Sequence, residues 1–212
     1  MNIALIGASG FIGSALLAEA LARGHRVTGL VRQPERLTAH PHLTAMQCDV
    51  YDTADLAFLL AGYDAVLVSL RGRGKHDNGQ HYLTGFRSIV QAAREAHVKR
   101  LLVVGGGGSL QVAPGLELLD APGFPEEHRG PAEGPREALK LLRGETVLDW
   151  TMLCPGAIIE PGKRTGRFRL GTDRLLVDER GESRISVQDF ALAMIDELER
   201  PAHPRQRFTV GY

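Results

Sequence analysis

Three glycines near the start of the chain have a spacing that suits phosphate binding. Gly7, Gly10 and Gly13 form a GxxGxxG pattern directly after the apolar run 3–6 and directly before a stretch with helical periodicity. A continuous apolar run is typical of a strand that helices cover on both faces of a parallel sheet. Glycine adopts backbone angles closed to other residues, and its missing side chain lets the main chain approach a ligand. The pattern predicts a strand, a tight turn and a helix.

The N-terminus of this predicted helix, near Phe11 and Ile12, is a candidate anion site. The first N–H groups of a helix have no partner within the helix, and its dipole places partial positive charge there. Small and apolar residues recur at helical spacing behind the turn, with Glu19 off that stripe: Gly13, Leu16, Leu17 and Ala20. We expect the turn to bind the pyrophosphate of a dinucleotide. An ordinary tight strand-to-helix turn is the alternative.

The residue after the second predicted strand, 26–31, indicates which dinucleotide is preferred. In dinucleotide-binding folds this strand end faces the adenosine ribose, where an acidic side chain accepts a hydrogen bond from the 2′-hydroxyl of NAD. Arg32 stands there instead. A guanidinium binds a phosphate bidentately, and hydrogen bonds to charged groups contribute ~1.5–3 kcal/mol. We therefore expect NADPH to be preferred over NADH. The alternative is that Arg32 is a solvated loop residue for which Glu35 competes.

Further strands follow at regular intervals, each ending near candidate site residues. The predicted strands cover residues 43–48, 64–70, 99–104, 148–154 and 207–210. Asp49 and Val50 are placed to border the adenine, although Asp49 could equally cap the next helix, as could Asp52. Ser69 and Leu70 are placed to close over the cofactor. The segment 71–80 is expected to be a loop.

The second half of the chain supplies the predicted substrate side. Four glycines, 105–108, end a strand and mark close approach by a ligand or another backbone, and Ser109 is the first side chain there able to form a hydrogen bond. Residues 105–125 show no helical or strand period, which predicts a lid loop over the substrate. Pro155 lies at another strand's carboxyl end, where open α/β sheets bind ligands. The pattern at 186–189 predicts a capping box.

A basic segment, residues 163–177, leaves two interpretations open. It contains Lys163, Arg164, Arg167, Arg169 and Arg174. These cations could bind an anionic group of a substrate or cofactor. Alternatively, the segment is a solvated basic hairpin without a ligand, and this is the interpretation that we favour.

Composition excludes several classes of function. The 212 residues suit one domain, and Lys plus Arg equals Asp plus Glu at 25 each, so neither nucleic acid nor a membrane is an expected partner. No apolar run approaches the ~18–20 residues that cross a bilayer, and we expect no signal peptide. Cys48 and Cys154 form no CxxC pair and are expected to be buried, inert thiols of a cytoplasmic protein. The eight histidines form no ligand set, so no metal is expected.

These motifs together resemble those of atypical short-chain dehydrogenases/reductases, specifically the NAD(P)H-flavin reductase and biliverdin-IXβ reductase-like group. The residues that carry the resemblance are IGASGFIG at 6–13, VR at 31–32, CDV at 48–50, GGGGSL at 105–110, CPGAIIEPG at 154–162 and RISVQDFA at 184–191. The resemblance implies a single Rossmann domain over 1–212: an α/β, doubly wound, mainly parallel sheet with helices on both faces. It also implies a small C-terminal extension, with substrate-side segments at about 105–130 and 155–185.

The resemblance and the strand ends together define a predicted site. The expected cofactor-binding residues are Gly7, Ser9, Gly10, Phe11, Ile12, Gly13, Arg32, Asp49, Val50, Ser69, Leu70, Gly105 and Pro155. Ser109 resembles the serine at the active-site end of the fifth strand and is the candidate catalytic residue. Its alternative role is to satisfy backbone groups at the glycine-rich strand end.

The sequence departs from this family in one chemically important way. Short-chain dehydrogenases use a Tyr-x-x-x-Lys pair, but the residues four places after Tyr51, Tyr63 and Tyr82 are not lysines, and Tyr212 ends the sequence. Reducing a carbonyl to an alcohol calls for a positioned acid. Hydride transfer to a conjugated ring such as a flavin needs chiefly positioning and a dry pocket. We therefore expect an NADPH-dependent reductase of a flavin or a similar small conjugated acceptor.

Two alternatives from other classes stay open. A binding protein that senses the NADP(H) redox state without turnover would also lack the catalytic pair. A sugar epimerase or dehydratase would retain a tightly held cofactor, and both the missing pair and the short C-terminal part count against it. The sequence names no particular acceptor, because lid loops set specificity and this one has no readable motif. It also indicates no oligomeric state.

Overall fold

The computed structural model describes residues 1–71 and 79–212. Most of the loop predicted at 71–80 therefore lies outside the described residues. Within them, eight strands form one sheet in the order β10-β12-β8-β5-β4-β1-β2-β3. The strands are β1 Asn2–Ile6, β2 Arg26–Val31, β3 Leu43–Gln47, β4 Ala65–Val68, β5 Arg100–Val104, β8 Asp149–Pro155, β10 Arg169–Gly171 and β12 Gln206–Gly211. All neighbours pair in parallel except β10, which is antiparallel to β12.

This strand order is the doubly wound arrangement that the sequence predicts. The chain runs outward from β1 through β2 to β3, returns to β4 on the other side of β1, and then continues outward to β12. The direction of winding reverses between β1 and β4. Open α/β sheets bind their ligands outside the carboxyl ends of the strands at such a reversal.

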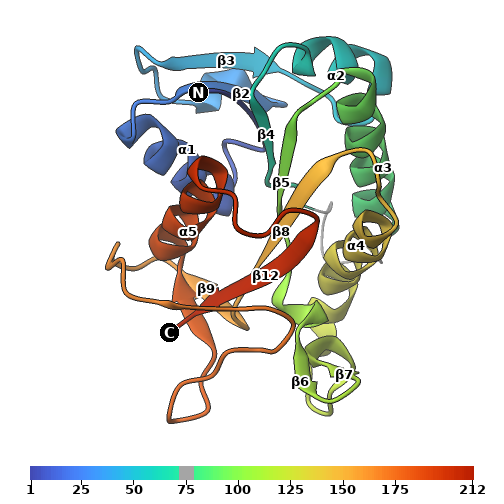
Figure 1. The fold of residues 1–212 in the computed structure, drawn as a ribbon, viewed down its shortest axis with the longest axis vertical. Coiled ribbons are helices and arrows are strands. Elements are labelled where there is room, and N and C mark those ends of the chain that lie inside the picture. Colours follow the sequence, from blue (N-terminus) through green and yellow to red (C-terminus); the bar gives the residue numbers. More distant parts are fainter. Residues whose placement is uncertain (72–78) are drawn as a thin grey trace.

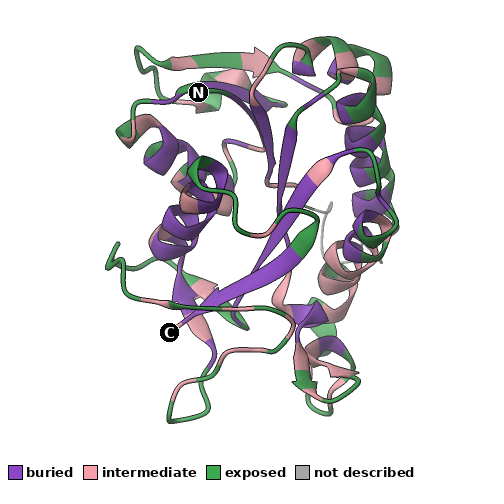
Figure 2. Ribbon diagram, viewed as in Figure 1, coloured by how far each residue is buried: buried purple, intermediate pink, exposed green. Residues whose placement is uncertain are grey.

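Helices cover both faces of the sheet (Figure 1). Helices α1 (Phe11–Ala22) and α5 (Val187–Glu199) pack together on one face, and α2 (Thr53–Leu60), α3 (Gln80–Glu95) and α4 (Glu126–Arg143) lie on the other. Each layer has its own apolar core, so β1, β4, β5 and β8 are buried from both sides (Figure 2). This double cover explains why these strands are continuous apolar runs. The α/β fold class is confirmed.

An apolar stripe at helical spacing runs along α3. Tyr82, Phe86, Ile89, Val90 and Ala93 are all buried. They occupy the face of α3 that packs between the sheet and its neighbouring helices. The stripe therefore positions the helix on the sheet.

The prediction that residues 105–125 have no regular structure is wrong. The segment forms a 3-10 turn (Gly107–Ser109), a hairpin of β6 (Gln111–Ala113) and β7 (Leu116–Glu117), and a second 3-10 turn (Leu118–Asp120). Leu110 and Leu119 are fully buried and anchor it. Strands of two or three residues are too short to show a period in the sequence.

The region around the start of α5 is held by a buried carboxylate. The Ser186 hydroxyl accepts the N–H of Asp189, as the predicted capping box requires. The Asp189 side chain does not complete the box. It accepts hydrogen bonds from the N–H groups of Thr165 and Gly166 and from the Thr165 and Tyr212 hydroxyls. Burial opposes ionisation of Asp189, but these hydrogen bonds outweigh it and lower its pKa.

Part of the basic segment 163–177 is used inside the protein. Arg164 binds both carboxylate oxygens of Glu19. The Arg169 guanidinium donates to the carbonyl oxygens of Val177 and Tyr212. Glu19, which lies off the apolar stripe of α1 in the sequence, is buried at this contact. Arg164 and Arg169 thus contribute to holding the C-terminal part of the chain on the sheet.

Candidate functional site

A pocket of about 620 Å³ lies at the carboxyl ends of β1, β2 and β4. It occupies the point where the winding of the sheet reverses, which is where an α/β sheet binds a nucleotide. The residues that line it are Ile6, Gly7, Ser9, Gly10, Phe11, Leu30, Val31, Arg32, Arg36, Cys48, Asp49, Val50, Tyr51, Ser69, Leu70 and Arg71.

The glycine turn is shaped by backbone contacts that exclude any side chain. Gly7 has a φ of +80°, and a Cβ atom added there would lie 2.3 Å from the Ser69 carbonyl oxygen. A Cβ atom on Gly13 would lie 2.0 Å from the Gly7 carbonyl oxygen. Gly7 is thus required for the turn itself, and Gly13 for the close packing of α1 against it.

The N-terminus of α1 faces this pocket without a side-chain cap. Gly10 is the N-cap residue and, having no side chain, forms no cap hydrogen bond. The Ser14 hydroxyl turns away and donates to the carbonyl oxygen of Phe11. Gly10 and Phe11 both line the pocket. The first turn of the helix is therefore suited to an anion such as a pyrophosphate, as the sequence predicts.

Two arginines border the pocket beyond β2. Arg32 and Arg36 are exposed, and neither forms an ion pair with any residue that the structure describes. Glu35 does not pair with Arg32 either, so the competition considered from the sequence is not seen among these residues. Arg36 lies in a 3-10 turn, Pro34–Arg36, that returns it toward the pocket. The two guanidinium groups are suited to a phosphate at this end.

Asp49 and Val50 line the same pocket. Asp52, rather than Asp49, caps α2, because its carboxylate accepts the N–H of Asp55. The Asp49 carboxylate accepts the N–H of Tyr51, a contact that holds the loop at the pocket. Asp49 therefore does not cap α2, and its place beside the adenine stays a prediction.

The structure brings nine of the thirteen predicted cofactor residues to the pocket and leaves four outside it. Ile12 and Gly13 belong to α1 just behind the turn, whereas Gly105 and Pro155 are buried at β5 and β8. The sequence interpretation missed Arg36, Cys48, Tyr51 and Arg71, which also line the pocket. Arg36 was recognisable as a second cation one helical turn after Arg32. That these residues bind the cofactor stays a prediction.

Ser109 lies beneath the glycine segment, away from the residues that line the pocket. Ser109 is 2% exposed, and its hydroxyl donates to the carbonyl oxygen of Gly106 at 3.2 Å. The Arg207 guanidinium donates to the Ser109 carbonyl and hydroxyl oxygens at 3.3 and 3.4 Å. This is the backbone-satisfying arrangement considered as the alternative for Ser109. A catalytic role for Ser109 stays a prediction.

Both cysteines are buried, as predicted. Burial, together with the carboxylates of Asp55, Asp49 and Asp52, raises the pKa of the Cys48 thiol to about 12. Burial also raises the pKa of the Cys154 thiol, against the opposing effect of Arg207. Both groups are therefore thiols at neutral pH, and neither is a ready nucleophile.

Replacing Tyr82 by phenylalanine is expected to raise the free energy of unfolding by about 1 kcal/mol, because its hydroxyl is buried without a partner. Tyr82 is 3% exposed, and its hydroxyl forms no hydrogen bond with the part of the chain that the structure describes. Chemical denaturation of the purified variant measures the change. Tyr63→Phe is the matched control, since the Tyr63 hydroxyl donates to Thr28 at 2.8 Å and its removal should cost about 1 kcal/mol. A loss of stability in Tyr82→Phe would show that the hydroxyl has a partner.

Comparison with known proteins places this chain in a family. A family model described as NAD(P)H-binding matches residues 7–199. The uncharacterised protein YwnB of Bacillus subtilis is 39% identical over 213 residues, covering 99% of this chain and 98% of YwnB. The structure of a Bacteroides thetaiotaomicron protein provisionally named an epimerase has a TM-score of 0.94 at 44% identity, covering 100% of this chain and 96% of that one.

The name of a third relative refers to a reaction. A Streptococcus pneumoniae protein provisionally named an NADH-flavin reductase has a TM-score of 0.87 at 31% identity, and the match covers 100% of this chain and 99% of that one. The family match extends from the glycine turn to the last helix, which is most of the chain. The chain belongs to the NAD(P)H-binding family.

Proposed function

We propose that the protein is an NADPH-dependent reductase that transfers hydride to a flavin or a similar conjugated acceptor. The observation that carries the proposal is the pocket at the sheet reversal, which combines an uncapped helix N-terminus with two arginines beyond β2. NADPH supplies the hydride when it is bound. The helix N-terminus suits its pyrophosphate, and Arg32 and Arg36 suit its 2′-phosphate.

The choice of a conjugated acceptor is supported by the missing catalytic pair of short-chain dehydrogenases. No Tyr-x-x-x-Lys pair exists in the sequence. The candidate Ser109 is engaged with Gly106 and Arg207. A conjugated ring delocalises the negative charge that it gains with the hydride. Its reduction therefore depends less on a positioned acid than the reduction of a carbonyl does. The Streptococcus pneumoniae relative, provisionally named an NADH-flavin reductase, supports the same class.

The direct test is oxidation of NADPH by the purified protein with FMN, FAD and quinone acceptors, followed at the nicotinamide absorbance band. We expect oxidation that depends on both protein and acceptor, and the Gly7→Ala variant provides the inactive control. Binding of NADPH without turnover of any acceptor would contradict the reductase and favour redox sensing. The buried position of Ser109 makes that second function worth testing in the same assay.

Replacing Arg32 by alanine is expected to weaken NADPH binding about 10- to 100-fold, which corresponds to ~1.5–3 kcal/mol for hydrogen bonds to a charged group. NADH, which has no 2′-phosphate, should lose little affinity. Isothermal titration of both nucleotides measures the difference. Arg26→Ala is the matched control, because Arg26 is an exposed arginine at the opposite end of β2. An equal loss for both nucleotides would show that Arg32 does not select for the 2′-phosphate.

A further inference from the structure

Within residues 1–71 and 79–212, no strand pairs with the outer edge of β3. β3 is the last strand in the sheet order and lies along the top margin of the molecule in Figure 1. Its residues are exposed or half-buried, whereas the strands at the centre of the sheet are buried (Figure 2). An open strand edge presents unpaired N–H and C=O groups that can pair with another strand.

The hydrogen-bond pattern identifies which groups face outward. The His42 carbonyl oxygen accepts the Val27 N–H, and the Cys48 N–H donates to the Val31 carbonyl oxygen. Because backbone groups alternate along a strand, residues 42, 44, 46 and 48 bond to β2, and Leu43, Ala45 and Gln47 face away from it. The N–H of Leu43 donates to His40 in a turn. In residues 1–71 and 79–212, no backbone hydrogen bond reaches the outward groups of Ala45 and Gln47.

The composition of β3 lacks the usual devices that block edge pairing. Leu43–Gln47 reads LTAMQ, without a charged residue or a proline, and its pairing with β2 has no bulge. The opposite edge strand, β10, contains a charged residue, Arg169. One edge of this sheet is therefore guarded and the other is not.

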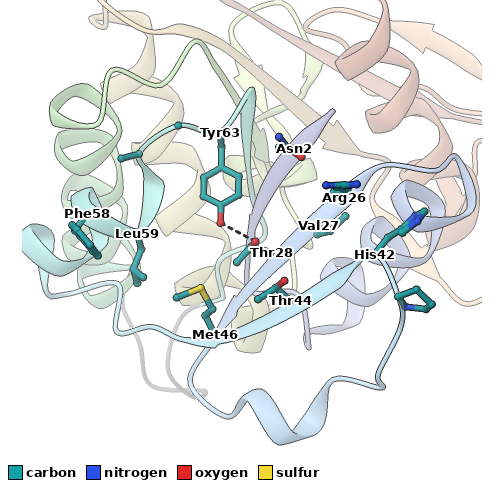
Figure 3. Close-up of a pocket in the computed structure, with 13 residues that line it drawn as sticks. Asn2, Arg26, Val27, Thr28, His42, Thr44, Met46, Phe58, Leu59 and Tyr63 are labelled. Atoms are coloured by element: carbon teal, nitrogen blue, oxygen red, sulfur yellow. Dashed lines mark hydrogen bonds between the residues drawn. The ribbon is translucent and has the colours of Figure 1, made fainter.

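A groove lined by both polar and apolar residues lies beside β3 on the face of the sheet that carries α2 (Figure 3). Thr44 and Met46 of β3 point into it, and Phe58 and Leu59 of α2 form its opposite side. The groove has a volume of about 680 Å³, and the Phe58 side chain is 81% exposed. The exposed Phe58 ring therefore offers apolar surface beside the open strand edge.

We propose that two copies of this chain associate through β3, paired antiparallel about a two-fold axis at Ala45. In this register Ala45 bonds to the partner's Ala45 in both directions, and the Gln47 N–H donates to the carbonyl oxygen of the partner's Leu43. Every outward group of Ala45 is then satisfied. The contact is self-complementary, as two-fold interfaces must be.

Charge favours a second copy over an unrelated partner. An uncharged strand pairs with itself without bringing like charges together. The exposed His40 and His42 precede β3, and the exposed Asp49 follows it. Antiparallel pairing places the two histidines of each copy, which can donate hydrogen bonds, beside the Asp49 carboxylate of the other. Asp49 also lines the nucleotide pocket, so the dimer contact adjoins the adenosine end of that pocket.

Light scattering and sedimentation of the full chain across a dilution series test the proposal. We expect a mass twice the 23.0 kDa of one chain at high concentration. Ala45→Pro removes an outward N–H group that forms no hydrogen bond with β2. Because proline is tolerated in edge strands, the variant should still fold. We expect this variant to have half the wild-type mass with unchanged nucleotide binding. Ala45→Thr keeps the N–H and should remain dimeric.

A charge-swap experiment tests the position of the two-fold axis without altering the backbone. Because Ala45 faces the partner's Ala45, Ala45→Lys and Ala45→Glu should each be monomeric through repulsion of like charges. Mixing the two variants should restore the dimer mass. Three results would overturn the proposal. The wild-type chain could stay monomeric, or both Ala45→Pro and Ala45→Lys could leave the dimer intact. The third is a mixture of Ala45→Lys and Ala45→Glu that does not reassociate. Reductase activity is not part of the readout.

Discussion

Gly7→Ala is expected to lower the free energy of unfolding by about 2–5 kcal/mol and to abolish nucleotide binding. Two costs add: a side chain in the left-handed region costs ~1–2 kcal/mol, and overpacking a fixed contact costs ~1–3 kcal/mol. The φ of Gly7 is +80°, and the added Cβ would meet the Ser69 carbonyl oxygen at 2.3 Å. Because that atom belongs to the backbone after β4, it cannot move without opening the pocket. Urea denaturation measures the stability, and titration with NADPH measures the binding.

Gly24→Ala is the control that separates these two costs. Gly24 has almost the same backbone conformation, with a φ of +79°, but an added Cβ would meet nothing within 4 Å. The control should therefore lose only the conformational cost of ~1–2 kcal/mol and should keep its nucleotide affinity. Equal losses in the two variants would show that the approach of Ser69 to the turn has no energetic consequence. Retained binding in Gly7→Ala would show that the turn is not the phosphate site.

The central sheet could be predicted from the sequence because its signals are local and strong. The apolar runs that became β1, β4 and β5 are continuous because helices bury both faces of these strands. The glycine turn was identifiable for a similar reason. Gly13 is required because an added Cβ would meet the backbone of Gly7 in the same turn, and Gly7 is favoured locally by its own positive φ. Features that depend on close neighbours in sequence are therefore visible before the structure is known.

The 105–125 segment could not be predicted because its structure depends on distant partners. Its hairpin contains strands of three and two residues, too short for a period to appear. Its order comes from buried Leu110 and Leu119 and from backbone contacts with residues near 173. The Gln111 N–H donates to the Asp173 carbonyl oxygen, and the Leu175 N–H donates to the Gln111 carbonyl oxygen. The many glycines and prolines of the segment reflect turns within an ordered element.

Buried charges were the second feature that periodicity could not reveal. Glu19 is charged and lies off the apolar stripe of α1, a pattern that indicates a solvated position. It pairs with Arg23 one turn further along α1 and with Arg164, which is 145 residues away in the sequence. Pairing at that separation depends on the completed fold, and the burial of a charged group depends on its partner. For the same reason the role of Ser109 was left between two alternatives, since the Arg207 that binds it lies on β12.

Glu197→Ala is expected to lower the free energy of unfolding by about 3–5 kcal/mol, the cost of leaving one member of a buried ion pair unpaired. Glu197 is 4% exposed and binds Arg100 at 2.8 Å. It also accepts the Ala202 and His203 N–H groups and contacts the His203 ring. One carboxylate thus joins α5, β5 and the loop that leads into β12. Its removal leaves a buried guanidinium whose other carboxylate contact, with Asp149, is at 3.4 Å.

Glu199→Ala provides a control on the same helix, two residues further on. Glu199 also pairs with an arginine and a histidine, Arg23 and His25, but its side chain is 31% exposed. Water can replace a carboxylate at such a position, so its loss should cost no more than about 1 kcal/mol. The difference between the variants, measured by urea denaturation, isolates the effect of burial from that of pairing. If Glu197→Ala were as stable as Glu199→Ala, water would be able to reach Arg100, and the layer between α5 and the sheet would be looser than the structure indicates.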